Sequence, residues 1–331
     1  MSTETSLDTL RRWPRRSLAA LPTRLVPAAN LAAELGDDPP DLWIKMDAET
    51  GFALGGNKVR KLELELAEGR LEGVTHLVTA GGPQSNHCRV TAAAAAHLGL
   101  GCVLVLNGPE PDAPTGNARL HRLFGAEIET VRNREDRTPA MEAVASRIEA
   151  EGGRPLVVPI GASTGLGALG YALATLELAD QLDGLPPRDK TWLFTSASSC
   201  GTLGGLLLGV SLLDRQDIRL VGVSADATAW EIRTESVRLA REGAGLLGWD
   251  GNVRETALAA ADEFVGEGYG IPTAAGREAL ELFGRKEGIV LDPVYTAKAA
   301  AGMISWIRGG GVPPDHRVVF LHTGGHPAFL G

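Results

Sequence analysis

The sequence Leu54-Gly55-Gly56-Asn57-Lys58-Val59-Arg60-Lys61 places a lysine between a pair of glycines and the start of a patterned helix. Glycine allows backbone conformations and close approaches that a side chain would block. A lysine in such a bend becomes a nucleophile near neutral pH if its amine is removed from water, because burial lowers its pKa. The alternative is that Lys58 is a solvated residue of the first helical turn. The rest of the chain decides between these readings.

Short apolar segments alternate with helical patterns along the chain. Strands are expected at residues 42–46, 76–80, 102–106, 127–131, 156–159, 191–195, 220–224, 289–292 and 318–321. Helices are expected over residues 59–70, 91–98, 115–124, 139–151 and 273–287, and others end near residues 212, 242 and 308. This rhythm indicates right-handed βαβ units and parallel sheets. Because 331 residues exceed the usual size of one core, we predict two α/β domains, each of three layers, with parallel-rich sheets.

The composition is that of a soluble globular protein, with 44% hydrophobic and 22% charged residues. A formal net charge of −9 argues against nucleic acid as a partner, because binding to phosphates requires a basic surface. No apolar segment is long enough to cross a bilayer, so no membrane partner is expected.

Two further features bear on the compartment. The arginines near the N-terminus precede no apolar region, which favours a solvated leader over a targeting signal. Cys88, Cys102 and Cys200 form no C-x-x-C pair and no metal-ligand spacing. A reduced, cytoplasmic setting without a disulfide framework is therefore expected.

Four expected strand ends carry small polar clusters. These are Ser85-Asn86-His87, Ser198 to Thr202, Tyr295-Thr296 and His322 to Gly325. Ligands of open parallel sheets bind at the carboxyl ends of strands. The run Ser-Ser-Cys-Gly-Thr opens a helix, where backbone N–H groups and hydroxyls converge on an anion. A plain helix cap is the alternative, and the lysine of a P-loop is lacking. Together with Lys58, this cluster predicts a single phosphate on a small cofactor.

Three competing motifs are weaker. Gly165 to Gly170 matches G-x-G-x-x-G, but no acidic residue ends the following strand, which favours a glycine-lined crossing between domains over dinucleotide binding. His87, His322 and His326 have no carboxylate or cysteine at ligand spacing, so backbone-bonded or substrate-facing imidazoles are expected and no metal. Ser85 with His87 lacks the G-x-S-x-G elbow of acyl-transfer enzymes.

Several motifs resemble those of one enzyme family, in order and over nearly the whole chain. They are Gly55 to Glu63, Gln84 to His87, Gly167 to Tyr171, Leu291 to Thr296 and His322 to Gly325. The chain resembles the D-cysteine desulfhydrase and 1-aminocyclopropane-1-carboxylate (ACC) deaminase family of fold-type-II pyridoxal-phosphate (PLP) enzymes. The resemblance implies a tryptophan-synthase-β-like fold, PLP as cofactor, a small amino acid as substrate and a homodimer.

The resemblance also implies roles toward the cofactor. Lys58 would hold PLP as a Schiff base and shuttle the Cα proton. Asn86 would bond the phenolic oxygen, and Thr296 would face the ring nitrogen. The phosphate would be held by Ser198, Ser199, Cys200, Gly201 and Thr202, with the contribution of Cys200 the least typical of the family.

Other roles concern the substrate. Ser85 would bind its carboxylate or act in proton transfer, so it joins Lys58 among the catalytic residues. Tyr269 and Tyr295 would flank the substrate and act in catalysis. Gln84, Asn86, His87 and Thr323 would complete the substrate pocket.

Thr296 and Thr323 favour one reaction of the family. By resemblance, ACC deaminases carry glutamate and leucine at these two positions. A carboxylate keeps the ring nitrogen protonated and strengthens the electron sink, whereas a hydroxyl gives a weaker one. A weaker sink suffices when a good leaving group departs from Cβ. The implied reaction is α,β-elimination by a carbon–sulfur lyase, which converts D-cysteine to pyruvate, ammonia and sulfide.

Alternatives remain open at this point. L-cysteate sulfo-lyases share most of these motifs and release sulfite, and a sulfonate requires an extra cation or several hydroxyls. Arg89 or the pair Ser163-Thr164 could supply them, with surface or capping roles as alternatives. ACC deamination and a non-catalytic PLP or amino-acid binding protein are the other readings.

The expected domains are a large PLP-binding domain of residues 1–58 and 165–331 and a small mobile domain of residues 59–164. The cofactor is expected in the cleft between them. Closure of the small domain over the substrate would exclude water from the reacting carbanion.

Overall fold

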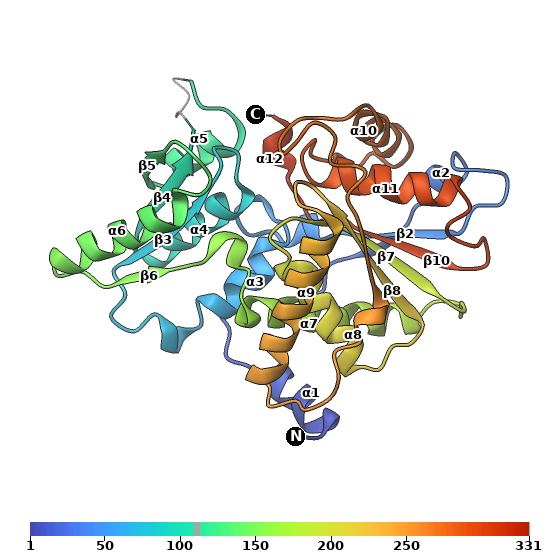
Figure 1. The fold of residues 1–331 in the computed structure, drawn as a ribbon, viewed down its shortest axis with the longest axis horizontal. Helices are drawn as coiled ribbons and strands as arrows, with labels where there is room; N and C mark the ends of the chain where they lie inside the picture. The colour runs from blue at the N-terminus through green and yellow to red at the C-terminus, as the bar shows by residue number, and fades with distance from the viewer. Residues whose placement is uncertain (109–112, 331) are drawn as a thin grey trace.

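The computed structural model describes residues 1–108 and 113–330, and they form two separate sheets (Figure 1). The larger sheet has the order β1-β2-β10-β7-β8-β9, in which only β1 is antiparallel to its neighbour. Its strands are β1 (Leu25–Pro27), β2 (Asp41–Lys45), β7 (Thr191–Ala197), β8 (Ile218–Ser224), β9 (Leu258–Ala261) and β10 (Arg317–Leu321).

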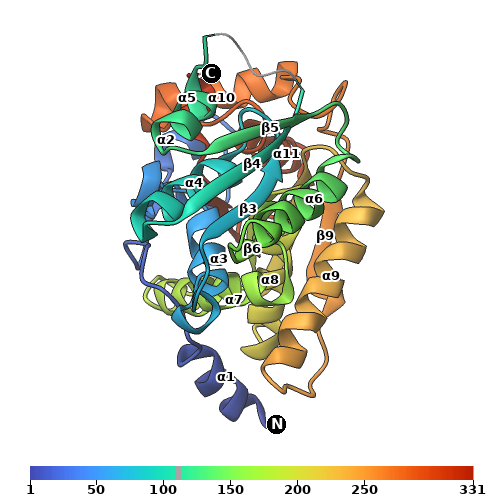
Figure 2. The same ribbon diagram turned by 90° about the vertical axis from the view of Figure 1, so that its left-hand side faces the viewer.

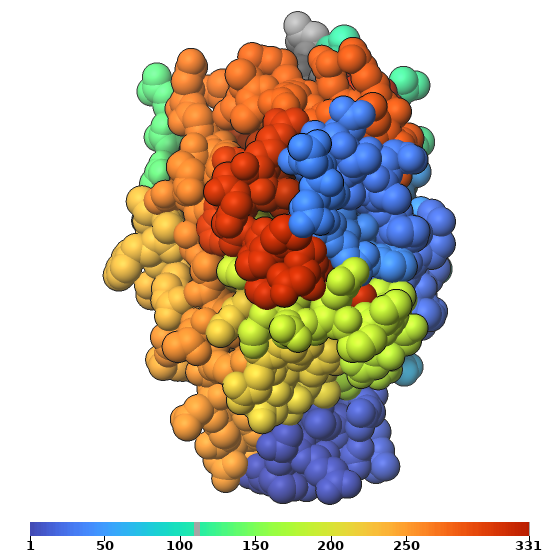
Figure 3. Space-filling model, turned by 90° about the vertical axis from the view of Figure 1, so that its right-hand side faces the viewer, coloured from blue at the N-terminus to red at the C-terminus, as the bar shows by residue number. Residues whose placement is uncertain are grey.

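Helices cover both faces of the larger sheet. Successive strand residues point to opposite faces, so Leu193 and Val319 join one core and Phe194 and Phe320 the other. The first core is covered by α1 (Thr3–Arg11), α7 (Gly165–Asp183), α8 (Gly201–Leu212) and α9 (Ala229–Leu246). The second core is covered by α2 (Ala29–Ala32), α10 (Ala274–Glu287) and α11 (Thr296–Arg308). The connections that precede β2 (blue), β7 (yellow-green) and β10 (red) lie together on the face shown in Figure 3.

The smaller sheet has the order β5-β4-β3-β6 and is parallel throughout (Figure 2). Its strands are β3 (His76–Gly81), β4 (Gly101–Asn107), β5 (Glu127–Val131) and β6 (Pro155–Val157). One face packs against α4 (Asn86–Leu98), which α5 (Gly116–Leu123) adjoins, and the other packs against α6 (Arg137–Ala150). Each sheet therefore lies between helical layers, which confirms the predicted pair of three-layer α/β units.

Helix α3 (Lys58–Glu65) lies between the two units. Val59 and Leu62 belong to a core of the smaller sheet, and Leu64 belongs to a core of the larger. A Cβ on Gly170 of α7 would come within 2.4 Å of the Arg60 carbonyl oxygen, so glycine permits α3 and α7 to cross closely. The motif from Gly165 to Gly170 thus serves close helix packing. This agrees with the glycine-lined crossing that the sequence favours over dinucleotide binding.

Four local expectations differ from the structure. Residues 289–292 form no strand, because the Val290 carbonyl accepts from the His322 ring and Asp292 caps the next helix. Residues 3–11, expected in a solvated leader, form α1, whose Leu10 is buried in a core. Helix α7 extends as far as Asp183, into the polar, proline-containing residues 181–190, where a connector is expected, and β9 was not predicted. The short helix α12 (His326–Phe329) ends the described chain. In the described ranges, every helix is too short or too polar to span a bilayer.

Candidate active site

A cavity of about 300 Å³ opens between the two units, at the carboxyl ends of their parallel strands. Residues that follow β3, β7, β8 and β10 line it, together with the beginnings of α3 and α8. Of the four polar clusters expected at strand ends, each contributes at least one residue to this cavity. The four clusters that the sequence singled out therefore meet at one cavity.

Lys58 lies in the cavity because two loops meet backbone to backbone. The Asn57 N–H donates to the Thr323 carbonyl at 2.9 Å. A Cβ on Gly324 would lie only 2.7 Å from the Gly56 Cα, and both glycines have positive φ, 98° and 109°. Burial lowers the pKa of the Lys58 amine from 10.5 to about 8, against the effect of its hydrogen bond with Lys61. About a tenth of this amine is therefore uncharged and nucleophilic at pH 7, far more than for a lysine of ordinary pKa.

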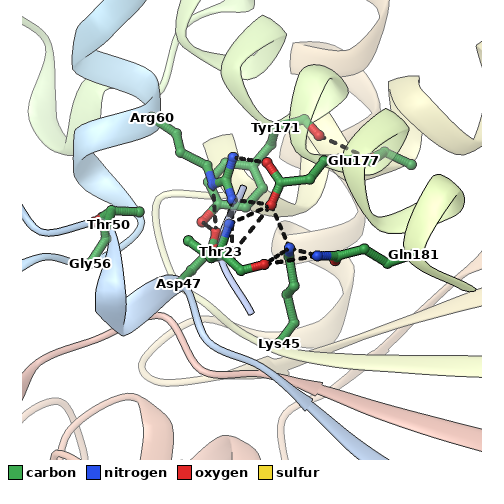
Figure 4. A network of polar contacts seen from close by, with 10 residues as sticks. Thr23, Lys45, Asp47, Thr50, Gly56, Arg60, Tyr171, Glu177 and Gln181 are labelled. Carbon is green, nitrogen blue, oxygen red and sulfur yellow. Dashed lines mark hydrogen bonds and ion pairs between the residues drawn. The ribbon is translucent and has the colours of Figure 1, made fainter. Parts of the chain in front are cut away.

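Helix α3 is held in place by a buried ionic network that begins two residues after Lys58 (Figure 4). The Arg60 guanidinium donates to both carboxylate oxygens of Asp47 at 2.9 Å and to Glu177 at 2.9–3.0 Å. The Tyr171 hydroxyl donates to Asp47 at 2.6 Å, and Lys45 pairs with Glu177. Burial opposes ionisation of Asp47, but the charge and hydrogen bonds of Arg60 hold its pKa below the ordinary value. The network ties α3 to β2 and α7 of the larger sheet.

The start of α8 forms a cradle of hydroxyls and N–H groups. Ser163 donates to the Ser199 hydroxyl at 2.9 Å and accepts from the Gly201 N–H at 3.3 Å. The Thr202 hydroxyl accepts from the Asn57 side chain at 2.9 Å. A Cβ on Gly201 would lie 2.7 Å from the Ser163 hydroxyl oxygen, so a side chain there would fill the cradle. The first N–H groups of a helix have no partner within it and point toward an anion.

Lys61, which the sequence did not assign, adds an amine to this cradle, and an anion bound there would favour its charged form. Lys61 is fully buried, and its Nζ lies 3.4 Å from the Ser163 hydroxyl. Burial, with the charge of Lys58, lowers the pKa of Lys61 well below its ordinary value. In the described ranges it has no carboxylate within ion-pair distance. Its spacing of three residues from Lys58 puts both amines on one helix face, and this was a usable signal.

Cys200 takes part in the cradle only through its backbone. Its φ is +60°, and its thiol is directed to the Ser198 carbonyl at 3.2 Å. Burial raises the pKa of this thiol to about 12. The thiol is therefore neutral, and its hydrogen bond goes to a backbone carbonyl.

The loop after β3 supplies a second set of donors. The Ser85 hydroxyl caps α4 by accepting from the Cys88 N–H at 3.2 Å, and Ser85 lines the cavity. The side-chain oxygen Oδ1 of Asn86 accepts from the Asn117 side chain at 2.9 Å, which leaves the side-chain N–H groups of Asn86 to donate. Gln84 is turned away: its side chain bonds the backbone of Thr115 and Asn117 and does not line the cavity.

His87 lines the cavity as a neutral imidazole. Burial, with the charges of Lys58 and Lys61, lowers its pKa well below the ordinary value. The Thr79 hydroxyl donates to the Val158 carbonyl at 2.7 Å, so it accepts from His87 Nε2–H at 2.9 Å. The His322 ring is bonded instead to a backbone carbonyl, that of Val290.

Two tyrosines form another part of the cavity wall. The Tyr269 and Tyr295 hydroxyls share a short hydrogen bond, and burial raises the pKa of both, so both are neutral at pH 7. The Thr323 hydroxyl lies 3.2 Å from that of Ser196, and both residues line the cavity.

Thr296 is set back from the cavity wall. It is fully buried, and its hydroxyl donates to Asp292 at 2.8 Å. Asp292 also accepts from three backbone N–H groups of this turn and itself lines the cavity. The role of Thr296 beside a ring nitrogen stays a prediction.

The residues proposed for a sulfonate lie elsewhere. Arg89 donates to the Gly55 carbonyl at 2.7 Å and does not line the cavity. Ser163 belongs to the cradle, and Thr164 caps α7 by accepting from the Gly167 N–H at 2.8 Å. Two other arginines, Arg134 and Arg137, do line the cavity. They follow β5, so strand-end reasoning extended to that strand could have found them.

The donor set fits pyridoxal phosphate. The cradle and Lys61 offer N–H groups, hydroxyls and a cation to a phosphate, Lys58 offers a nucleophilic amine to an aldehyde, and Asn86 offers N–H to a phenolate. Where residues are described, no cluster of His, Cys, Asp and Glu is arranged to hold a metal.

Comparisons with known proteins agree with this chemistry. Residues 16–324 match the model of a family described as pyridoxal-phosphate dependent enzyme. The D-cysteine desulfhydrase of Salmonella newport (strain SL254) is 39% identical over 329 residues, which cover 98% of each chain. The D-cysteine desulfhydrase of Salmonella typhi is 38% identical over the same shares.

Solved structures agree as well. A homologue of ACC deaminase has a TM-score of 0.88 at 34% identity, over 98% of this chain and 96% of that one. Threonine deaminase isoform 2 from Solanum lycopersicum has a TM-score of 0.66 at 15% identity, over 98% and 84%, and at that identity the likeness concerns the fold alone. These matches confirm the predicted fold class.

Proposed function

The chain belongs to the family of pyridoxal-phosphate dependent enzymes, and on this basis we propose that it is a carbon–sulfur lyase that eliminates sulfide from D-cysteine. The observation that carries the proposal is Lys58, a buried amine of lowered pKa placed between an anion cradle and the donors of the Ser85 loop. The relatives named D-cysteine desulfhydrase, which align with nearly the whole chain, support the choice of substrate.

The chain's own groups divide the work of elimination. Bound pyridoxal phosphate supplies an electron sink for the bonds at the substrate's Cα. The cradle and Lys61 hold its phosphate, and Asn86 donates to its phenolic oxygen. The Ser85 hydroxyl and the N–H groups that begin α4 bind the substrate carboxylate. The Lys58 amine, with its pKa of about 8, takes the Cα proton.

The elimination breaks the Cα–H bond and the Cβ–S bond. The Cα–H electron pair forms the Cα–Cβ double bond, and the Cβ–S pair leaves with sulfur as hydrosulfide. The neutral Tyr269 and Tyr295 hydroxyls flank the substrate, and the one that accepts their mutual hydrogen bond keeps its proton to donate to the substrate. The released 2-aminoacrylate tautomerises and takes up water to give pyruvate and ammonia.

The proposal includes a large domain of residues 1–58 and 165–331 and a small domain of residues 59–164. It also includes a homodimer and a cytoplasmic location. Support for two domains comes from the two separate sheets on either side of the cavity. Sedimentation equilibrium of the purified protein tests the dimer.

A substrate panel tests the function. Purified enzyme with PLP is offered D-cysteine, L-cysteine, L-cysteate, D-serine and ACC, and sulfide, sulfite and keto acids are measured. We expect sulfide and pyruvate in equal amounts from D-cysteine, and no turnover by Lys58→Ala. Turnover of ACC alone would sink the proposal, and full activity of Lys58→Ala would remove its central residue.

A further inference from the structure

Two arginines of the smaller unit line the cavity: Arg134, in the segment between β5 and α6, and Arg137, the first residue of α6. Arg134 reaches across to the larger unit. Its Nη2 lies 2.7 Å from an Asp226 carboxylate oxygen, and its guanidinium lies 4.8 Å from the centre of the Tyr269 ring. Arg134 is therefore neutralised and held by residues of the other sheet.

Arg137 is held by its neighbour but not neutralised. Its Nε donates to the Arg134 carbonyl at 2.9 Å, which leaves both terminal nitrogens of the guanidinium for a ligand. In the described parts of the chain, no carboxylate lies within ion-pair distance of Arg137. Burial, together with the charge of Arg134, lowers the pKa of Arg137. An arginine guanidinium nevertheless stays charged in proteins.

The other charges of the cavity are already matched. Asp226 pairs with Arg134, and Asp292 accepts from the donors of its own turn. Lys58 and Lys61 face the cofactor's aldehyde and phosphate in the function proposed above. Arg137 is thus the cation left over for the substrate, among the described residues that line the cavity.

We propose that Arg137 is a specificity-determining residue that binds an anionic sulfur group on the substrate's Cβ, and that the Arg134–Asp226 bridge positions it. This rests on the proposed elimination, whose sulfur leaving group departs as an anion. The guanidinium can donate two parallel hydrogen bonds to the oxygens of a sulfonate, or it can pair with a thiolate, which takes a proton from the Tyr269–Tyr295 hydroxyl pair as it departs as hydrosulfide. In both cases it stabilises the sulfur that takes the electron pair of the breaking Cβ–S bond.

The test compares Arg137→Gln and Arg137→Lys with Arg132→Gln in the holoenzyme. Arg132 is an exposed arginine of the same segment that does not line the cavity, so its variant controls for lost charge. We expect Arg137→Gln to lower kcat/KM for the anionic sulfur substrate roughly ten- to hundredfold, the range for a hydrogen bond to a charged group. D-serine, whose Cβ substituent is neutral, should change by less than about threefold. Arg137→Lys should recover part of the loss.

Two sources of the anion are distinguished by product. Arginine-dependent sulfide release from D-cysteine identifies a thiolate, and arginine-dependent sulfite release from L-cysteate identifies a sulfonate. Calorimetric titration with methanesulfonate gives a readout without turnover: wild type and Arg132→Gln should bind it, and Arg137→Gln should not. Equal kinetics and equal methanesulfonate binding in Arg137→Gln and Arg132→Gln would overturn the inference. A wild-type enzyme inactive on every sulfur amino acid contradicts the proposed function instead, and the titration still tests Arg137.

Discussion

Replacement of Lys61 by methionine tests how much the cofactor's phosphate contributes to binding, apart from the rest of the cofactor. The Lys61 Nζ lies 3.4 Å from the Ser163 hydroxyl and would lie 3.0 Å from a Cβ on Gly201, so it reaches an anion seated at the start of α8. A hydrogen bond to a charged group contributes about 1.5–3 kcal/mol net. Since about 1.4 kcal/mol is a tenfold change, Lys61→Met should weaken PLP binding about ten- to hundredfold.

The same substitution should not harm the protein without cofactor. Lys61 is fully buried, and its lowered pKa means that folding disfavours its charge. A folded-state pKa below the unfolded one costs stability at neutral pH, because the unfolded chain binds the proton more strongly. Methionine fills a similar volume without this cost. Urea unfolding of the apoprotein should therefore show equal or higher stability for Lys61→Met.

Fluorescence titration of the apoenzyme with PLP and with pyridoxal, which lacks the phosphate, gives the decisive comparison. We expect Lys61→Met to lose affinity for PLP and to bind pyridoxal as the wild type does. Lys190→Met, at a partly exposed lysine that precedes β7 and so lies at the end of this strand opposite to the cradle, serves as the control. Equal losses for both ligands would assign Lys61 to packing, and unchanged PLP affinity would refute its role at the phosphate.

Three further predictions follow from the geometry around Lys58. Burial lowers the Lys58 pKa from 10.5 to about 8, so the fraction of free amine increases as pH rises through 8. Reconstitution of the apoenzyme with PLP, followed by stopped-flow absorbance, should therefore accelerate with a midpoint near pH 8. A midpoint near pH 10.5 would contradict this. Arg60→Met leaves the buried Asp47 without an ionic partner and Glu177 with Lys45 alone, and should cost about 3–5 kcal/mol in urea unfolding, whereas the surface variant Arg11→Met should change stability far less. Gly56→Ala, at φ +109° and 3.1 Å from the Thr323 carbonyl, should lower both Tm and bound PLP, while Gly284→Ala, in open space on α10, should not; equal behaviour of the two would show that the loop contact is dispensable.

The sequence was informative where local chemistry determines geometry. A Ser-Ser-Cys-Gly-Thr run after an apolar strand has few structures other than a helix start, and a lysine after two glycines must lie where backbones approach closely. Such features need no knowledge of distant residues. Lys58, Ser85, Asn86 and Thr323 accordingly line one cavity, as expected.

Other features depend on partners that are distant in sequence. Whether Gln84 faces the cavity is decided by Asn117, 33 residues away, which takes up its carbonyl oxygen. Thr296 is held by Asp292, and the Cys200 thiol by the Ser198 carbonyl, although either side chain could equally have faced a ligand. The apolar run at 289–292 satisfies the local pattern of a strand, but its backbone is bonded by side chains instead. The periodicity of the sequence does not show which hydrogen-bond partner each of these groups takes.

The placement of α3 bears on how the cavity closes. The helix shares apolar side chains with the smaller sheet through Val59 and Leu62, yet its most extensive packing is against α7 of the larger unit. The Arg60 network adds buried charges bound to Asp47 and Glu177, and separating such pairs costs several kcal/mol, whereas sliding of apolar side chains costs far less. We infer that α3 moves with the larger sheet, which shifts the start of the small mobile domain from the proposed residue 59 to a hinge beyond Glu65. Lys58 and the cradle would then keep a fixed geometry around the cofactor, while the Ser85 loop and Arg137 approach the substrate from the moving side.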